Sequence, residues 1–244
     1  MHGVALFQRI FHREERQQPA CSAVVAAAGN STRMGGTDKI MAELDGTPVI
    51  GHTLMALEQC PLLSEIIVVT REELIVPISQ LCRELGLSKV SKVVVGGGTR
   101  TESVIRGLQE VRDEAEFVAI HDGARPFVSA ELLDAVIRTA WRCNAAAPAV
   151  PVKDTVKRAA DGLVLETLDR SELWAVQTPQ VFEASLIRAA LHQAQQEGVA
   201  LTDDCMAVER LGMTVTLTQG SHENFKITTP LDLMLGEALL DCRD

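Results

Sequence analysis

The sequence predicts an α/β fold: a Rossmann-like, mostly parallel and twisted sheet flanked by helices, with a protruding β-hairpin arm. Short apolar runs, each about the length of a buried strand, alternate with longer helix-like segments along most of the chain. Between about 150 and 172 this rhythm gives way to a polar–apolar alternation around a turn. Strand, helix and strand in succession indicate right-handed crossovers between parallel strands.

Four apolar runs predict strands of the sheet. They cover residues 24–28, 66–69, 93–95 and 117–120. Each is too short for a helix of ordinary length and rich in β-branched or small apolar residues. A further strand is expected at 214–217, and residues 174–177 lead into another turn.

Helix signals fall between these runs. Thr47 followed by Pro48 resembles an N-cap with proline at the first helical position, so we expect a helix through about Gln59. A helix over 72–85 is expected despite Pro77, with Gly86 at its end. Other expected helices cover 101–111, 131–142 and 183–196, and new helices open at 202–204 and 228–230.

The arm is predicted by an alternating segment at 152–158, a turn at 160–162 and a second segment at 163–167. Its alternation implies one solvated face. Because an isolated hairpin is only marginally stable, we expect the arm to pack against something else, for which a second subunit is the natural choice.

Composition excludes several classes of protein. The net charge of −10 over 244 residues argues against a nucleic-acid binder, which needs a basic face. No apolar run approaches the ~18 residues of a membrane span. The six cysteines contain no Cys-x-x-Cys pair, which argues against structural zinc. Because the sequence shows no signal peptide, we expect reduced thiols in the cytoplasm. Residues 1–20 are interpreted as an N-terminal extension, flexible or a short helix, and 21–244 as a single domain.

The loop from Gly29 to Lys39 is the strongest local signal. It follows an apolar run, is rich in small residues and carries Arg33 and Lys39, which suits the binding of phosphates. It does not match the P-loop, because Met34-Gly35-Gly36 stands where that motif needs Gly-Lys-Ser/Thr. Nor does it match the dinucleotide-binding motif, because Ser31 stands where that motif needs Gly. A turn with solvated cations is the simpler alternative.

Cations gather at one predicted edge of the sheet. The loops that follow the apparent strands, together with the segment before the last helix, carry Arg33, Lys39, Arg100, Arg125, Lys226 and a single carboxylate, Asp122. Ligands of open α/β sheets bind at this edge. Several cations with one acid suit a polyphosphate and Mg²⁺, and the chemistry of phosphoryl or nucleotidyl transfer. The sequence has no Gly-x-Ser-x-Gly elbow and no histidine spacing typical of zinc.

From about Ser22 to the last helix, the chain resembles the 2-C-methyl-D-erythritol 4-phosphate cytidylyltransferases of the non-mevalonate isoprenoid pathway. The resemblance depends on many short motifs in order, each weak alone. They are 27–29 with Arg33, Met34 and Lys39, 96–97 with Arg100, Ser103 and Val104, 121–126, 151–158, 169–170, 173–174, 177–180, 202–204 and 224–228.

The resemblance implies roles for individual residues. Arg33, Lys39 and Lys226 would be catalytic, and Asp122 would hold Mg²⁺. The CTP-binding residues would be Ala27, Ala28, Gly29, Gly97, Ser103, Asp122 and Gly123. The sugar-alcohol phosphate would be bound by Arg125, Thr155, Lys157, Arg170, Thr178 and Thr202, with help from Lys226. It also implies a homodimer in which the arm reaches into the neighbouring site.

The sequence departs from the usual pattern of the family at a few positions. Gly98 stands where an acidic residue is common, and Asp38 stands where proline is common. Ser31 and Thr32 replace a glycine and a basic residue, and Gly123 replaces a frequent alanine. Every proposed catalytic cation is nevertheless present.

The implied reaction is in-line attack of the acceptor's phosphate oxygen on the α-phosphorus of CTP, with loss of pyrophosphate. Simpler interpretations remain open for single residues: Thr202 as an N-cap, Thr178 as part of a turn, Arg170 and Lys157 as solvated charges, and Asp122 as a helix cap. Three other functions also remain open. They are a cytidylyltransferase for another polyol phosphate such as ribitol 5-phosphate, a uridylyl- or guanylyltransferase, and a non-catalytic nucleotide-sensing module.

Overall fold

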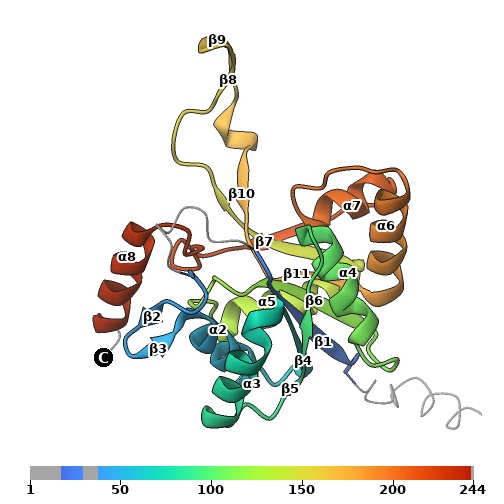
Figure 1. The fold of residues 1–244 in the computed structure, drawn as a ribbon. Helices are drawn as coiled ribbons and strands as arrows, with labels where there is room; N and C mark the ends of the chain where they lie inside the picture. The colour runs from blue at the N-terminus through green and yellow to red at the C-terminus, as the bar shows by residue number, and fades with distance from the viewer. Residues whose placement is uncertain (1–17, 30–37, 243–244) are drawn as a thin grey trace, which may run out of the picture.

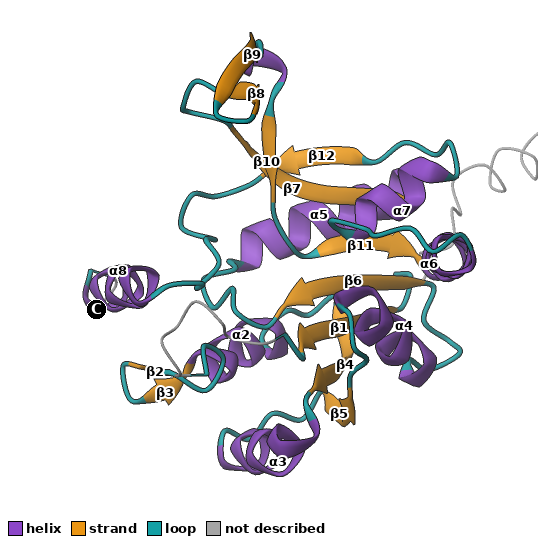
Figure 2. Cartoon of the chain, turned by 45° about the horizontal axis from the view of Figure 1, so that its top comes forward, coloured by secondary structure: helices purple, strands orange, loops and turns teal. Residues whose placement is uncertain are grey.

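A computed structural model describes residues 18–29 and 38–242 of the chain. Its main sheet has eight strands, in the order β10-β7-β11-β6-β1-β4-β5, with β12 paired to β7. The strands are β1 (Cys21–Ala27), β4 (Leu63–Thr70), β5 (Val90–Val95), β6 (Phe117–Asp122), β7 (Ala145–Pro151), β10 (Trp174–Val176), β11 (Gln180–Glu183) and β12 (Thr216–Gln219). In Figure 2 they descend from β12 and β7 through β6 and β1 to β5.

The sheet is mixed but mostly parallel, as predicted. β1 pairs in parallel with both β4 and β6, and β4 pairs in parallel with β5. β11 runs antiparallel to β6 and β7, and β10 runs antiparallel to β7. The four predicted strands are confirmed as β1, β4, β5 and β6, and β5, at the edge of the sheet, is the one whose residues are not buried.

Helices cover both faces of the sheet. One face packs against α2 (Val49–Glu58), α3 (Ile75–Glu84) and α5 (Ala130–Cys143), and the other against α4 (Arg100–Glu110), α6 (Ala184–Gln196) and α7 (Asp204–Arg210). The last helix, α8 (Pro230–Asp241), stands apart beside the small ribbon of β2 (Glu43–Leu44) and β3 (Thr47–Pro48), as Figure 1 shows. Each face of the sheet thus has its own apolar core.

Helix boundaries depart from the sequence prediction in two places. Thr47 and Pro48 form β3 rather than an N-cap and a first turn, and the helix begins at Val49. Residues 72–85 divide into a 3₁₀ turn, η1 (Glu72–Leu74), and α3. Pro77 is tolerated because it lies in the first turn of α3, where backbone N–H groups have no partner within the helix. Helices are confirmed in the other predicted places.

The arm leaves the body of the protein and extends away from it (Figure 1). β8 (Lys157–Ala160) and β9 (Leu163–Thr167) form an antiparallel hairpin, followed by the 3₁₀ turn η2 (Arg170–Glu172). Asp161 and Gly162 at its tip have positive φ angles of 49° and 78°, which the tight turn requires. The predicted first strand is wrong at its start, because residues 152–156 are not in a strand.

Two predictions from the sequence fall on residues that the structure does not describe. The proposed extension at 1–20 lies almost entirely outside the described residues, and Arg33 lies in the undescribed stretch between Gly29 and Asp38.

Among the described helices, none has the length and apolar character needed to span a bilayer.

Candidate active site

A cavity of about 290 Å³ opens at the carboxyl edge of the parallel strands. Ligands of open α/β sheets bind at this edge, because the loops that follow the strands converge there. Several sequence-predicted residues line the cavity together: Ala27, Ala28, Gly29, Lys39, Gly97, Ser103, Asp122 and Lys226. The loops after β1, β5 and β6 therefore meet at one site, as the sequence predicted.

Glycine is required where the loop after β5 meets the loop after β1. A Cβ on Gly96 would lie 2.5 Å from Ala28 Cβ and 2.7 Å from Ser103 Oγ. Contacts this short do not occur between real side chains, so only glycine allows the two loops to approach. The Ser103 hydroxyl accepts a hydrogen bond from the Gly97 N–H at 3.1 Å and donates to the Thr99 carbonyl at 2.9 Å. Backbone and small side chains thus form this wall.

Asp122, the last residue of β6, is the centre of the charged part of the cavity. Its Oδ2 lies 2.7 Å from Lys226 Nζ and 3.8 Å from Arg125 Nε. Its Oδ1 lies 3.5 Å from Arg100 Nε. The Asp122 side chain is only 10% exposed. One buried carboxylate therefore holds three cations at one end of the cavity.

These cations determine the ionisation of Asp122. Burial alone would raise the pKa of its carboxyl, but Lys226, followed by Arg100 and Arg125, outweighs burial and holds that pKa well below its usual range. Burial lowers the pKa of Arg125, and Asp122 only partly offsets that effect. Asp122 is therefore an anion at neutral pH.

A second carboxylate corrects the prediction that Asp122 is the only acid at this edge. Asp204 Oδ2 accepts a hydrogen bond from Arg100 Nη2 at 2.7 Å, and its side chain is 1% exposed. Gln180 holds the start of α7, because its Oε1 accepts hydrogen bonds from the N–H groups of Asp204 and Cys205. Arg100 therefore links two buried acids, which come from opposite halves of the sequence.

Sequence reasoning missed Asp204 because it treated residues 202–204 only as a helix start. Asp203 is the N-cap of α7, since its side chain accepts from the Met206 N–H, so the alternative of Thr202 as the cap is wrong. Thr202 is exposed, and its hydroxyl lies 3.6 Å from Met206 Sδ. The burial of Asp204 becomes visible only in the fold, where Gln180 of β11 accepts hydrogen bonds from the start of α7.

Thr178 and His121 hold Asp122 in place through buried hydrogen bonds. The Thr178 hydroxyl accepts from the Asp122 N–H at 3.0 Å and lies 3.1 Å from His121 Nδ1. His121 Nε2 lies 3.2 Å from the Arg125 carbonyl. Burial lowers the pKa of His121 to about 4, so the ring is neutral at pH 7. Thr178 is buried, so in this chain it fixes the backbone at the end of β6.

Gly123 is also buried and lies behind the cavity wall. Its N–H donates to the Ala26 carbonyl at 3.0 Å, and its carbonyl accepts from the Thr53 hydroxyl at 2.9 Å. A Cβ at this position would lie 2.8 Å from Ile50 Cδ1 and 3.0 Å from Ala27 Cβ. Gly123 therefore holds β1 and β6 together at the cavity floor.

The three predicted site residues of the arm are not brought to the cavity. Thr155, Lys157 and Arg170 are exposed. Lys157 Nζ donates to Thr167 Oγ1 at 2.6 Å, and Arg170 Nη1 donates to the Lys153 carbonyl at 2.9 Å. Their known partners thus lie within the arm itself.

Arg71 is a cavity-lining residue that sequence reasoning also missed. It follows β4, contacts the Gly29 carbonyl and forms an ion pair with Asp38. The signal was available, because the rule that selected the loops after the other parallel strands applies equally to the loop after the strand at 66–69.

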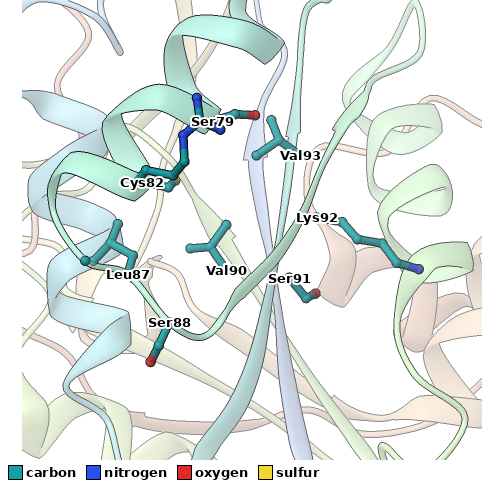
Figure 3. Close-up of a pocket in the computed structure, with 10 residues that line it drawn as sticks. Ser79, Cys82, Leu87, Ser88, Val90, Ser91, Lys92 and Val93 are labelled. Carbon is teal, nitrogen blue, oxygen red and sulfur yellow. The ribbon is translucent and has the colours of Figure 1, made fainter.

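A second cavity, of about 330 Å³, lies between α3 and β5 (Figure 3). Serines and apolar side chains dominate its lining. Lys92 borders it, but its amine is paired with Glu110 at 2.8 Å. Burial raises the pKa of the Cys82 thiol to about 11, which leaves that thiol unreactive. Its charged lining residues among those described are the cations Lys92 and Arg83, and they include no counterpart of the Asp122 carboxylate.

Comparison with known proteins gives a consistent result. The family model described as 2-C-methyl-D-erythritol 4-phosphate cytidylyltransferase matches residues 21–242. A protein of that name from Halalkalibacterium halodurans is 44% identical over 90% of this chain and 96% of its own length. Another, from Desulforamulus reducens, is 46% identical over 91% of this chain and 96% of its own length.

Solved structures agree. The crystal structure of 4-diphosphocytidyl-2C-methyl-D-erythritol synthase from Anaerococcus prevotii superposes with a TM-score of 0.83 at 30% identity, covering 92% of this chain and all of the other. The structure of 2-C-methyl-D-erythritol 4-phosphate cytidylyltransferase from Thermus thermophilus superposes with a TM-score of 0.76 at 34% identity, covering 90% and 98% of the two chains.

Proposed function

The chain belongs to the 2-C-methyl-D-erythritol 4-phosphate cytidylyltransferase family, and from this premise we propose that the charged cavity is where its reaction takes place. The chain is a nucleotidyltransferase of the non-mevalonate isoprenoid pathway. It joins CTP and 2-C-methyl-D-erythritol 4-phosphate to give 4-diphosphocytidyl-2-C-methyl-D-erythritol, and pyrophosphate is released.

The observation that carries the proposed site is the set of cations around Asp122, in the cavity that Lys39 also lines. The reaction brings an acceptor phosphate against a triphosphate, so repulsion between anions is its main obstacle. A protein of net charge −10 cannot offset that repulsion by its overall field. Local cations, fixed before the substrates arrive, can do so.

The proposed chemistry is direct transfer. An oxygen of the acceptor phosphate attacks the α-phosphorus of CTP in line, a new P–O bond forms, and the bond from the α-phosphorus to the bridging oxygen breaks. Pyrophosphate leaves with the electron pair of that bond. The acceptor is already an anion, so no general base is required. Lys39 and Lys226 stabilise the charge that builds on the transferred group, and Arg33 is proposed to assist from outside the described residues.

The walls of the cavity support a division of the substrate contacts. Ala27, Ala28 and Gly29 present backbone near Lys39, since a Cβ on Gly29 would lie 4.0 Å from Lys39 Nζ. That arrangement suits the triphosphate. Gly97 and Ser103 lie across the cavity on the β5 side, where we place the cytidine.

We propose that Mg²⁺ binds at Asp122. Among the described residues, no group of three or more acids, histidines or cysteines could hold a metal, so we propose that the phosphates of CTP and water supply the remaining ligands. Mg²⁺ commonly binds in this way, through one or two carboxylates and the substrate's own oxygens. Asp122 fits, because it is ionised and borders the cavity. When bound, Mg²⁺ would supply additional positive charge at the phosphates.

We further propose a homodimer, with the arm of one chain completing the acceptor site of the other. Three neighbouring apolar side chains of the arm are exposed, Leu163 by 71%, Val164 by 61% and Leu165 by 58%. Such a surface on a projecting hairpin favours burial against a partner. Thr155, Lys157 and Arg170 would then meet the acceptor phosphate of the partner's site. The six free cysteines suit the cytoplasm as the location.

An acceptor and nucleotide panel tests the function. Purified protein with Mg²⁺ is given CTP, UTP or GTP with either 2-C-methyl-D-erythritol 4-phosphate or ribitol 5-phosphate, and pyrophosphate release is followed. We expect turnover with CTP and the methylerythritol phosphate, and at least about 10²-fold less with ribitol 5-phosphate. Binding of CTP without pyrophosphate release from any pair would contradict the assignment.

A further inference from the structure

Arg71 connects two separate parts of the cavity rim. Its Nη1 donates to the Gly29 carbonyl at 3.0 Å, and its Nη2 forms an ion pair with Asp38 Oδ2. Its Nε contacts Glu73 at 2.6 Å. The Arg71 side chain is 21% exposed, so these contacts are partly sheltered from water. A planar guanidinium can span two such partners at once, which the single ammonium of lysine cannot.

The two parts that Arg71 connects are the ones that surround Lys39. Gly29 follows β1, and a Cβ built on it would lie 4.0 Å from Lys39 Nζ. Asp38 is the residue before Lys39. A single side chain, that of Arg71, therefore contacts both the Gly29 backbone near the Lys39 amine and the Asp38 carboxylate.

The turn that contains Lys39 is anchored on its other side as well. Asp38 Oδ1 accepts a hydrogen bond from the Ile40 N–H at 3.0 Å. Ile40 is 2% exposed, and its carbonyl accepts from the Ile50 N–H at 2.9 Å. Lys39 thus lies between a core residue and Asp38. Asp38 is the less buried of these two anchors and forms an ion pair with Arg71.

The charge around Arg71 argues against a direct role on phosphate. Its guanidinium faces two carboxylates, those of Asp38 and Glu73. Little positive charge is left for a triphosphate. By contrast, the three cations Lys226, Arg100 and Arg125 face two carboxylates, those of Asp122 and Asp204, so one positive charge is in excess there.

We propose that Arg71 is a positioning residue, which holds Gly29 and Asp38 together so that the Lys39 amine is presented to the phosphates of CTP. This inference rests on the proposed role of Lys39. Arg71 acts through Lys39, so its contribution to turnover depends on the presence of that amine. Asp38 is its partner in this role, and Glu73 is not required.

A double-mutant cycle tests the inference. Steady-state turnover with CTP and 2-C-methyl-D-erythritol 4-phosphate is measured for the native chain, Arg71→Ala, Lys39→Ala and the double variant. Displacement of a catalytic group can cost up to about 10²-fold, so Arg71→Ala is expected to lower kcat by about 10- to 10²-fold. In the Lys39→Ala background, Arg71→Ala is expected to change kcat by less than about twofold, because coupled residues do not act additively.

Companion variants separate positioning from general structure. Arg71→Lys keeps the charge but cannot hold both partners, so it should lose most of the activity that Arg71→Ala loses. Asp38→Asn keeps an oxygen for the Ile40 N–H and loses the ion pair, so it should behave similarly. Glu73→Gln should retain near-native turnover. Arg138→Ala is the matched control, since Arg138 pairs at 2.7 Å with Asp134 on α5 and is absent from the cavity lining. Thermal melts accompany each variant.

Different outcomes identify different failures. Equal losses from Arg71→Ala with and without Lys39 would overturn the inference and leave the role of Lys39 intact. Native turnover of Arg71→Ala would do the same. Native turnover of Lys39→Ala would refute the proposed role of Lys39 and the inference with it. If Arg71→Ala does not fold, the same cycle with Asp38→Asn in its place decides the question by the same criteria.

Discussion

The buried cluster around Asp122 and the exposed arm are built in opposite ways. In the cluster, Asp122, Arg100 and Asp204 each contact residues distant in sequence, and the two acids are almost inaccessible to water. In the arm, charges pair with near neighbours, as Arg158 does with Glu166 at 2.9 Å, and both remain largely exposed. Exposed pairs of this kind contribute little to stability, whereas breaking a buried network is costly.

Under the proposed division of the site, this difference separates a nucleotide half from an acceptor half. The charges of the nucleotide half are fixed by contacts within the chain before any ligand binds, as electrostatic catalysis requires. The proposed acceptor half would depend on Lys157 and Arg170, whose known contacts lie within the projecting arm. Apolar exposure on the same arm is consistent with a partner that supplies the missing contacts.

The largest expected effect is on catalysis by the cluster. Lys226→Gln keeps a hydrogen-bond donor to Asp122 but removes a charge that we place at the transferred phosphate. We expect kcat to fall by about 10²- to 10³-fold, the cost of one electrostatic donor in other active sites. The fold should persist, because Arg100 and Arg125 still neutralise Asp122. Turnover and a thermal melt measure the two effects.

A fall in kcat of less than about threefold would contradict a catalytic role of the cluster, because that is well short of the usual cost of one lost electrostatic donor. The buried cluster would then be a structural feature and not part of the reaction. Unfolding of Lys226→Gln at room temperature would contradict the claim that the two arginines suffice.

A smaller effect concerns the pH dependence of stability. His121 has a pKa of about 4 in the fold because of burial, against about 6.5 in the unfolded chain. Between about pH 4 and 6.5, His121 binds a proton in the unfolded chain but not in the folded one. The contribution of His121 to the free energy of unfolding is therefore complete above about pH 6.5 and is lost as pH falls toward 4. The native chain should lose about 2 kcal/mol more between pH 7 and 5 than His121→Gln.

Denaturant unfolding of both proteins at pH 7 and pH 5 checks this expectation. Asp122 does not interfere, because its stabilising contribution is lost only below the carboxyl's ordinary pKa of about 3.9, as pH falls toward its lowered pKa in the fold. Equal losses for the native chain and His121→Gln would show that the ring beneath the cluster is not held neutral.

The part of the fold that was predictable is the part whose pattern is local. The strands β1, β4, β5 and β6 contain apolar runs of β-branched residues and alanine, and glycine-rich or charged residues follow each of them. β7 and β11 were not predicted. β7 reads Ala-Ala-Ala-Pro-Ala-Val-Pro, which has little intrinsic preference for a strand, and it forms because β10, β11 and β12 all pair with it.

The site was predictable to a similar extent. Lys39, Asp122 and Lys226 were found because each follows or flanks an apparent strand or helix, and all three line one cavity. Asp204 and Arg71 were missed, because an acid at a helix start and an arginine after a strand are ordinary in isolation. Only the fold brings Asp204 to Arg100 and Arg71 to Gly29.

Subunit complementation tests most directly the central claim that one site is built from the cavity of one chain and the arm of another. Lys226→Gln and Arg170→Ala are each purified, then mixed by joint refolding or coexpression, and pyrophosphate release is measured. Each variant alone should be nearly inactive. The mixture should recover about a quarter of native turnover, because half of the dimers would be mixed and each would hold one intact site. No recovery in a mixture shown to contain mixed dimers, or full activity of Arg170→Ala alone, would contradict the account.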